Sequence, residues 1–281
     1  MTSLDPRTVA ALVDAWLTED VGRGDRTTQA VVPEDLEGRA RIEAREETVV
    51  AGLNVAAEVF RQLGGESIKW LPEVADGTRV GAGGVLARIE GPLRAILTGE
   101  RTALNILQRL CGVATATAEV VTLVADTGVR IVDTRKTTPG LRVLEKYAVA
   151  VGGGHNHRAG LDDGILVKDN HILAAGGVGE ATRRAVSEAP HGLVVEVEVT
   201  DLDGLREALD NGASAVLLDN MTPDEIRRAV QENAGRALLE ASGGITRENI
   251  RSYAETGVDL ISLGALTHSA PAVDLALEVE N

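Results

Sequence analysis

Hydrophobic positions near the N-terminus follow first the spacing of a helix and then that of a strand. Apolar residues recur every three or four positions from Val9 to Leu17, behind Asp5 and Pro6, which suit a helix cap and a first helical position. Residues 39–45 alternate charged and apolar side chains, which predicts a half-buried strand. Similar patterns predict a polar, glycine-bearing loop over 20–28, a helix over 55–63 closed by two glycines, a strand and turn over 81–90, and a helix over 98–127.

A different rhythm begins after residue 130, where short apolar strands alternate with helical segments. This alternation predicts a parallel sheet with helices packed against it. Six strands fall short of the eight in a closed α/β barrel, so we expect an incomplete barrel, with an open doubly wound sheet as the alternative. The strands are expected near 131–132, 165–167, 193–199, 215–218, 237–239 and 260–261, and the helices near 140–150, 177–189, 202–210, 223–233 and 246–256.

Polar residues follow nearly every one of these strands. In parallel α/β folds the carboxyl ends of the strands meet at one edge of the sheet, and the chemistry is usually found there. We therefore expect one polar site at that edge. The residues concerned are Asp133–Lys136, Lys168–Asn170, Glu198, Asp219–Asn220, Ser242–Gly244 and Gly264.

The composition is that of a globular protein with an acidic surplus. Hydrophobic residues make up 44% of the chain and aromatic residues only 2%, so a sizeable core must be built from aliphatic side chains. Acidic residues outnumber basic ones by 43 to 28, a net charge of −15, which argues against nucleic acid or an anionic membrane as a partner. Arginine greatly outnumbers lysine among the bases; genomic base composition and adaptation to high salt would both explain this bias.

The sequence contains no pattern typical of export or of membrane insertion. The first ten residues carry Asp5 and no apolar run, and no stretch approaches 18 uninterrupted apolar residues. The chain has a single cysteine, Cys111, which excludes an intrachain disulfide and a multi-cysteine metal site. We expect a buried, inert thiol and a cytoplasmic protein.

Glycines follow the last two expected strands. Ser242, Gly243 and Gly244 follow one strand and precede an expected helix, and Gly264 follows the next strand. Glycines let backbone N–H groups approach an anion closely, and the loops after the last strands of α/β barrels often bind phosphate. The pattern therefore predicts a phosphate site, with tight turn packing as the alternative.

Five basic residues lie near strand ends or in the glycine-rich segment 152–160. In so acidic a chain, their convergence predicts a strongly anionic ligand, such as two adjacent carboxylates together with a pyrophosphate. The alternative is ion pairing within the protein, to Glu196, Glu198, Asp162 and Asp163. The five are Arg135, Lys136, His157, Arg158 and Lys168.

Two carboxylates interrupt an otherwise apolar strand. Glu196 and Glu198 are two residues apart and so point to the same face, and Asp219 ends the next strand. Buried carboxylates need cations, a metal or a cationic transition state nearby. They could stabilise an oxocarbenium-like sugar or hold Mg²⁺ on a leaving pyrophosphate. A purely structural ion network remains the alternative.

At these residues the chain resembles the quinolinate phosphoribosyltransferases, also called carboxylating nicotinate-nucleotide pyrophosphorylases. The resemblance runs in order from residue 19 to the end of the chain. The matching motifs are Glu19–Asp25 (EDVGRGD), Gly99–Asn105 (GERTALN), Asp133–Gly140 (DTRKTTPG), Gly152–Arg158 (GGGHNHR), Lys168–His171 (KDNH), Val195–Glu198 (VEVE), Leu218–Asn220 (LDN), Ala241–Ile245 (ASGGI) and Ser262–Gly264 (SLG).

The resemblance implies a small N-terminal α/β sandwich over residues 1–110 and an incomplete, six- or seven-stranded TIM-like α/β barrel over 111–269. The tail, 270–281, would pack back on the sandwich. It also implies a homodimer, or a higher homo-oligomer, in which the N-terminal domain of one subunit covers the barrel of its partner.

The resemblance also implies a role for each site residue. Arg135, His157, Arg158 and Lys168 would bind the quinolinate carboxylates, together with Arg101 of the partner subunit, although from its spacing alone Arg101 is an ordinary surface residue. Phosphoribosyl pyrophosphate and its Mg²⁺ would contact Lys136, Glu198 and Asp219, the three catalytic candidates, with Glu198 and Asp219 as the metal ligands. The 5′-phosphate would contact Ser242, Gly243, Gly244 and Gly264, and His268 has no assigned role.

The activity implied is transfer of phosphoribose to the quinolinate nitrogen, with loss of pyrophosphate and carbon dioxide, to give nicotinate mononucleotide for NAD biosynthesis. A related phosphoribosyltransferase of different base specificity is one alternative. A second is an aldolase on a similar barrel, with Lys168 forming a Schiff base. A third is a non-catalytic binder of a phosphorylated metabolite, which would need the glycine loops and not the carboxylates of Glu198 and Asp219.

Overall fold

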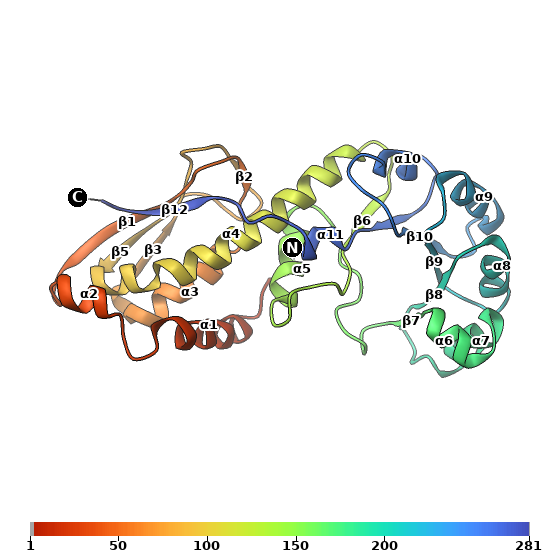
Figure 1. The fold of residues 1–281 in the computed structure, drawn as a ribbon, viewed down its shortest axis with the longest axis horizontal. Coiled ribbons are helices and arrows are strands. Elements are labelled where there is room, and N and C mark those ends of the chain that lie inside the picture. Colours follow the sequence, from red (N-terminus) through yellow and green to blue (C-terminus); the bar gives the residue numbers. More distant parts are fainter. Residues whose placement is uncertain (1–2, 281) are drawn as a thin grey trace. The chain divides into compact units, whose positions relative to one another are not determined.

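The computed structural model describes residues 3–280, so the outermost ends of the predicted domains, residues 1–2 and 281, lie outside the described residues. Contacts within the chain define two compact units, which Figure 1 colours by position in the sequence. The first unit contains the chain up to Ala118, residues 143–153, and the chain from Ser269 onward. The second contains residues 119–142 and 154–268.

The first unit is built on an antiparallel four-stranded sheet in the order β12-β1-β5-β3. These strands are β1 (Glu37–Ala44), β3 (Lys69–Pro72), β5 (Val85–Pro92) and β12 (Leu275–Glu280), and β2 (Thr48–Val49) pairs with β4 (Arg79–Val80). The helices are α1 (Pro6–Val21), α2 (Arg26–Val31), α3 (Leu53–Gly64), the 3₁₀ turn η1 (Gly65–Ser67), α4 (Leu93–Leu123) as far as Ala118, and α5 (Arg142–Val151) from Val143.

The core of the first unit lies between one face of this sheet and the helices. On β1 the side chains of Ala40, Ile42 and Ala44 are fully buried, which confirms the predicted alternation. Phe60 of α3 stacks on Trp70 of β3, with ring centroids 5.9 Å apart. Because aromatic residues are so scarce, this is the only ring pair among residues 3–280, and aliphatic side chains fill the rest of the core.

The second unit contains the predicted parallel sheet of six strands, in the order β6-β11-β10-β9-β8-β7. The strands are β6 (Arg130–Val132), β7 (Ile165–Val167), β8 (Val195–Val199), β9 (Ala215–Asp219), β10 (Leu238–Ser242) and β11 (Leu260–Ser262). The helices are α6 (Asp169–Ala175), α7 (Val178–Glu188), α8 (Leu202–Asp210), α9 (Pro223–Asn233), α10 (Ile250–Ala254) and α11 (Ala265–His268).

The strand order distinguishes between the two folds that the sequence leaves open. From β7 to β11 each strand is added beside the one before it, in a single direction. A doubly wound sheet reverses its direction at a switch point and has helices on both faces. Here the order does not reverse, and α7, α8 and α9 lie on one side of β8 and β9 (Figure 1). The winding is that of an α/β barrel left open between β6 and β7, which do not pair within the described residues.

Two local predictions were wrong, and one helix was missed. The loop expected over 20–28 is shorter, because the Asp25 carboxylate accepts a hydrogen bond from the Thr28 backbone and caps α2. The helix expected over 246–256 begins only at Ile250. Residues 169–175, which the pattern left unassigned, form α6 directly after Lys168.

Helix α4 is the one described helix with the length and apolar character of a membrane span. Half of its most apolar window is buried inside the protein, as is typical of a core helix. Cys111 of this helix is buried and donates to the Ala51 carbonyl, as the sequence predicts for an inert thiol. Burial raises the pKa of this thiol to about 12.

Close packing around Gly112 in the first unit predicts that a larger side chain at this position destabilises the fold. A Cβ on this residue of α4 would overlap the carbonyl oxygen of Pro271, which belongs to the segment leading into β12. We expect Gly112→Ala to lower the free energy of unfolding by about 1–3 kcal/mol, the range found for overpacked cores. Thermal denaturation measures the change. The matched control is Gly81→Ala, where an added Cβ meets no atom within 4 Å; equal losses in both variants would contradict the packing argument.

Candidate active site

The polar residues at the strand ends share one face of the parallel sheet. The register pairs Glu198 of β8 with Leu217 of β9, and Asp219 at the end of β9 with Ser242 of β10. Neighbours in register point to the same face, as do alternate residues along a strand. Glu198, Asp219 and Ser242 therefore point to the same face of the sheet. This is the grouping that the sequence predicts.

Two arginines at this edge have donors without acceptors. Arg135 follows β6, and Arg158 follows the segment at His155 that forms a bridge with Val132. The Nε atoms of Arg135 and Arg158 are both buried and make no hydrogen bond, and neither guanidinium forms an ion pair within residues 3–280. The Arg158 Nη1 donates to the carbonyl of Gly164 (2.8 Å). Since buried donors are nearly always satisfied, this pair is suited to an external anion.

The electrostatics of Arg158 support the same interpretation. Burial lowers the pKa of its guanidinium, the positive charge of Arg135 lowers it further, and the carboxylate of Glu196 opposes the shift. Two like charges held together, with no acid of the protein paired to either, favour a bound anion. The alternative of internal ion pairing therefore does not hold for the arginines.

Internal pairing does occur at two of the other three predicted cations, Lys168 and His157. The Lys168 ammonium lies 3.2 Å from a carboxylate oxygen of Glu198, and its side chain is half exposed. His157 is held at both ring nitrogens: Nδ1 accepts from the Arg158 backbone N–H (2.8 Å), and Nε2 lies 2.9 Å from Glu196. The first of these bonds assigns the ring proton to Nε2, so that Nε2 donates to Glu196.

Three acids are buried around His157. Asp133 is fully buried and accepts from the Asn156 amide (2.7 Å) and from the His157 backbone N–H (2.8 Å). Glu196 and Glu240 are 6% and 2% exposed, and a Glu240 oxygen lies 3.8 Å from the His157 Nε2. Burial, followed by the charge of Glu196, raises the pKa of Glu240 to about 7.

The ligand atoms of His157, Glu196 and Glu240 lie within 4.8 Å of one another, a spacing that a metal ion could use. A metal would need the lone pair of the His157 Nε2, yet that nitrogen carries a proton directed at Glu196. The arrangement therefore favours a hydrogen-bonded cluster over a metal centre. Glu198 and Asp219 fit Mg²⁺ better, because they offer carboxylate oxygens on neighbouring strands and at one face.

The predicted phosphate loops require glycine at two positions. Gly243 has φ +90°, and a Cβ there would overlap the side-chain oxygen of Asn220; Gly244 has φ +64°. A Cβ on Gly264 would lie 2.9 Å from the Cδ of Lys136, so these two site residues are in close contact. The helix expected after Gly244 begins only at Ile250, six residues later, and has five residues, so its N-terminus does not lie at these glycines.

One predicted residue lies in the other unit. Arg101 is an exposed residue of α4 in the first unit. His268 ends α11, beside Gly264 in the second unit.

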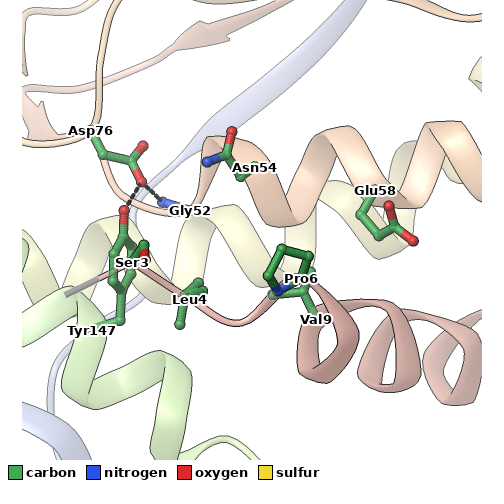
Figure 2. Close-up of a pocket in the computed structure, with 9 residues that line it drawn as sticks. All are labelled: Ser3, Leu4, Pro6, Val9, Gly52, Asn54, Glu58, Asp76 and Tyr147. Atoms are coloured by element: carbon green, nitrogen blue, oxygen red, sulfur yellow. Dashed lines mark hydrogen bonds between the residues drawn. The ribbon is translucent and has the colours of Figure 1, made fainter.

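A pocket of about 330 Å³ in the first unit contains none of the predicted site residues (Figure 2). One of its two carboxylates, Asp76, already accepts from the Tyr147 hydroxyl (2.6 Å) and from the backbone N–H groups of Gly52 and Leu53. With these bonds made, Asp76 is occupied in capping α3 and in holding α5. The pocket is lined by Ser3, Leu4, Pro6, Val9, Gly52, Asn54, Glu58, Asp76 and Tyr147.

The sequence interpretation missed Glu240. Its signal was the same as that of Glu196 and Glu198: an acid inside an apolar strand, two residues before the serine that begins the glycine loop. The sequence pattern predicts no specific role for Asp133, although its carboxylate accepts two hydrogen bonds from the segment that carries His157.

Comparison with known proteins identifies the family of the chain. Two domain families match consecutive parts of the chain: "Quinolinate phosphoribosyl transferase, N-terminal domain" over residues 25–111 and the corresponding C-terminal domain over residues 113–278. The probable nicotinate-nucleotide pyrophosphorylase (carboxylating) of Bacillus subtilis is 44% identical over 95% of this chain and 92% of its own, and the Mycobacterium leprae enzyme is 44% identical over 94% of both.

A solved structure extends the likeness to three dimensions. The nicotinate-nucleotide pyrophosphorylase from Francisella tularensis superposes with a TM-score of 0.94, at 42% identity, over 99% of this chain and 98% of its own. The likeness covers both units and every motif on which the resemblance rested. The chain belongs to the quinolinate phosphoribosyltransferase family.

Proposed function

We propose that this protein transfers phosphoribose from phosphoribosyl pyrophosphate to quinolinate, releasing pyrophosphate and carbon dioxide and forming nicotinate mononucleotide for NAD biosynthesis. The observation that carries the proposal is the pair Arg135 and Arg158, whose buried Nε donors have no partner among residues 3–280. Quinolinate has two adjacent carboxylates, which two adjacent guanidinium groups match in charge and in hydrogen-bonding geometry.

The chemistry needs positioning more than it needs a reactive side chain. The pyridine nitrogen attacks the anomeric carbon with its lone pair, and the bond to pyrophosphate breaks and takes its electrons with the leaving group. Arg135, Arg158 and Lys168 would hold quinolinate in line for this attack, which can contribute several kcal/mol, on the order of 7, to lowering the barrier. The ring nitrogen then carries a positive charge, so the C2 carboxylate leaves as carbon dioxide and C2 takes up a proton.

The sugar phosphate would lie on the glycine loops. Backbone N–H groups at Gly243 and Gly244 suit the 5′-phosphate because no Cβ obstructs their approach. Ser242 and Gly264 complete this subsite, and Lys136, in contact with Gly264, would reach the pyrophosphate. Mg²⁺, held by Glu198 and Asp219, would neutralise charge on the leaving pyrophosphate.

One observation argues against the aldolase alternative. A lysine that forms a Schiff base must be neutral, usually through desolvation or a neighbouring cation. Lys168 is half exposed and has a carboxylate partner, Glu198. The alternative of different base specificity is tested directly by assaying quinolinate against nicotinate as the phosphoribosyl acceptor. Turnover of quinolinate with release of carbon dioxide supports the proposal, and turnover of nicotinate alone refutes it.

We also propose that the protein is a cytoplasmic homodimer in which each active site takes Arg101 from the partner subunit. The support for the dimer is the family motif around Arg101 and the exposure of this residue on α4. The support for the compartment is the lone, buried Cys111, since a protein of an oxidising compartment commonly contains disulfides.

Removing the Lys168 side chain should weaken quinolinate binding selectively. We expect Lys168→Ala to lose about 10- to 100-fold in quinolinate affinity, the worth of one charge-assisted hydrogen bond, and to keep its affinity for phosphoribosyl pyrophosphate. Calorimetry of both ligands measures this. Lys69→Ala, which removes an exposed lysine of the first unit, is the matched control; unaltered quinolinate affinity in Lys168→Ala would exclude the assignment.

Neutralising Asp219 should slow turnover and leave the fold intact. Loss of one charged stabiliser of the transition state typically costs about 3–4 kcal/mol, so we expect turnover to fall by more than about a hundredfold in Asp219→Asn. Asp210→Asn removes an exposed carboxylate of the same unit, paired with Arg236, and should leave turnover unchanged. Wild-type rates for Asp219→Asn across a Mg²⁺ titration would refute the role.

Mixing two inactive variants tests the shared site. Arg101→Ala and Lys168→Ala homodimers should each be nearly inactive. In a mixed dimer with shared sites, one site receives both intact residues and the other receives neither. Equal amounts give roughly half mixed dimers, so about a quarter of wild-type activity should return. No recovery after verified subunit exchange would place Arg101 in its own subunit's site or outside it.

A further inference from the structure

Glu240 is a buried acid to which the proposed reaction gives no role. It lies in the middle of β10, its side chain is 2% exposed, and its Oε1 has no hydrogen-bond partner in the part of the chain that the structure describes. Its register neighbours are Leu217 of β9 and Leu260 of β11, both apolar. A carboxyl group in such surroundings is costly unless it is protonated or compensated by a cation.

Glu240 faces polar groups from four other parts of the second unit. Glu196 lies on β8, Asp133 follows β6, and His157 belongs to the segment after His155, with its Nε2 3.8 Å from a Glu240 oxygen. Ser262 of β11 supplies a hydroxyl. The surroundings of Glu240 thus contain two further acids and one imidazole.

His157 connects this cluster to the arginine pair. Its ring donates to Glu196 and accepts from the backbone N–H of Arg158, while its own backbone N–H donates to Asp133. In this arrangement neither ring nitrogen is available to a substrate carboxylate. His157 is therefore placed to fix the main chain of Arg158, which differs from the substrate contact that the sequence predicts for it.

We infer that Glu240 is a positioning residue of the quinolinate subsite: with Glu196 it holds the His157 ring, and through it Arg158, and it takes up a proton from solvent when the dianionic substrate binds. The inference rests on the proposed function, because it assumes that the anion bound at Arg135 and Arg158 is quinolinate. No bond other than that to the proton is made or broken in this step.

The direction of the coupling follows from charge. Burial and Glu196 raise the pKa of Glu240 to about 7 in the free protein, against the opposing effect of His157. A bound dianion brings further negative charge to the subsite and should raise that pKa again. Below about pH 7 Glu240 is protonated with or without substrate, so quinolinate affinity does not depend on pH there. At higher pH the free protein has lost the proton and binding must restore it, so the affinity falls.

Calorimetry of quinolinate binding, in buffers of different ionisation enthalpy, measures the proton uptake directly. Between about pH 6.5 and about pH 8.5, where both quinolinate carboxylates stay ionised, we expect wild-type affinity to fall by about three- to tenfold, with net proton uptake above about pH 7. Glu240→Gln should abolish the uptake and flatten the profile. Glu240→Asp keeps a titrating carboxyl and should keep the uptake. Glu255→Gln, at an exposed ion pair of the same unit, should behave as wild type.

The outcomes separate this inference from the proposed function. Failure of the wild-type protein to bind quinolinate at all would refute the proposed function. Binding without proton uptake, or uptake that persists in Glu240→Gln, would refute the role of Glu240 alone. An equal loss of quinolinate and phosphoribosyl pyrophosphate affinity in Glu240→Gln, with an unchanged pH profile, would show a merely structural role. If Glu240→Gln does not fold, the wild-type uptake and the Glu240→Asp profile still decide the question.

Discussion

Three buried carboxylates, those of Asp133, Glu196 and Glu240, constrain the structure of the second unit. A carboxylate removed from water needs donors or a cation within reach. Asp133 and Glu196 obtain theirs from one short segment, through the Asn156 amide and the backbone and ring of His157. This requirement holds the segment against the polar face of the sheet. The same bonds thereby fix the backbone position of the next residue, Arg158.

The same bonds explain why the arginines remain available. Because amide, backbone and imidazole donors satisfy Asp133 and Glu196, no guanidinium is needed for that purpose. Arg135 and Arg158 keep their Nε donors, in a chain whose net charge of −15 offers many acids that could have paired with them. By contrast, surface arginines such as Arg206 and Arg251 form ion pairs with acidic side chains. Arg135 and Arg158 thus lie at the edge where an anion can bind, each with a buried Nε that has no hydrogen-bond partner within residues 3–280.

The sequence predicted most of this arrangement, and its failures have physical causes. Strand alternation and the polar residues after each strand predicted the six-stranded parallel sheet and the grouping of Glu198, Asp219 and Ser242. The sequence could not predict that both ring nitrogens of His157 would form hydrogen bonds within the protein, because one of these bonds depends on the tertiary position of Glu196. Nor could spacing reveal α2, since Asp25 and Thr28 fit a polar loop as well as a helix cap.

The position of β12 has a consequence for how the chain can fold as it is synthesised. This strand contains residues 275–280, yet it pairs along the outer edge of β1, in a register that joins Ala44 to Leu275 and Arg39 to Glu280. Until residues 275–280 have been translated and have left the ribosome, β1 presents an unpaired edge to its surroundings. Exposed strand edges of this kind invite aggregation. The antiparallel sheet of the first unit therefore begins to be translated before the parallel sheet and is completed only after it.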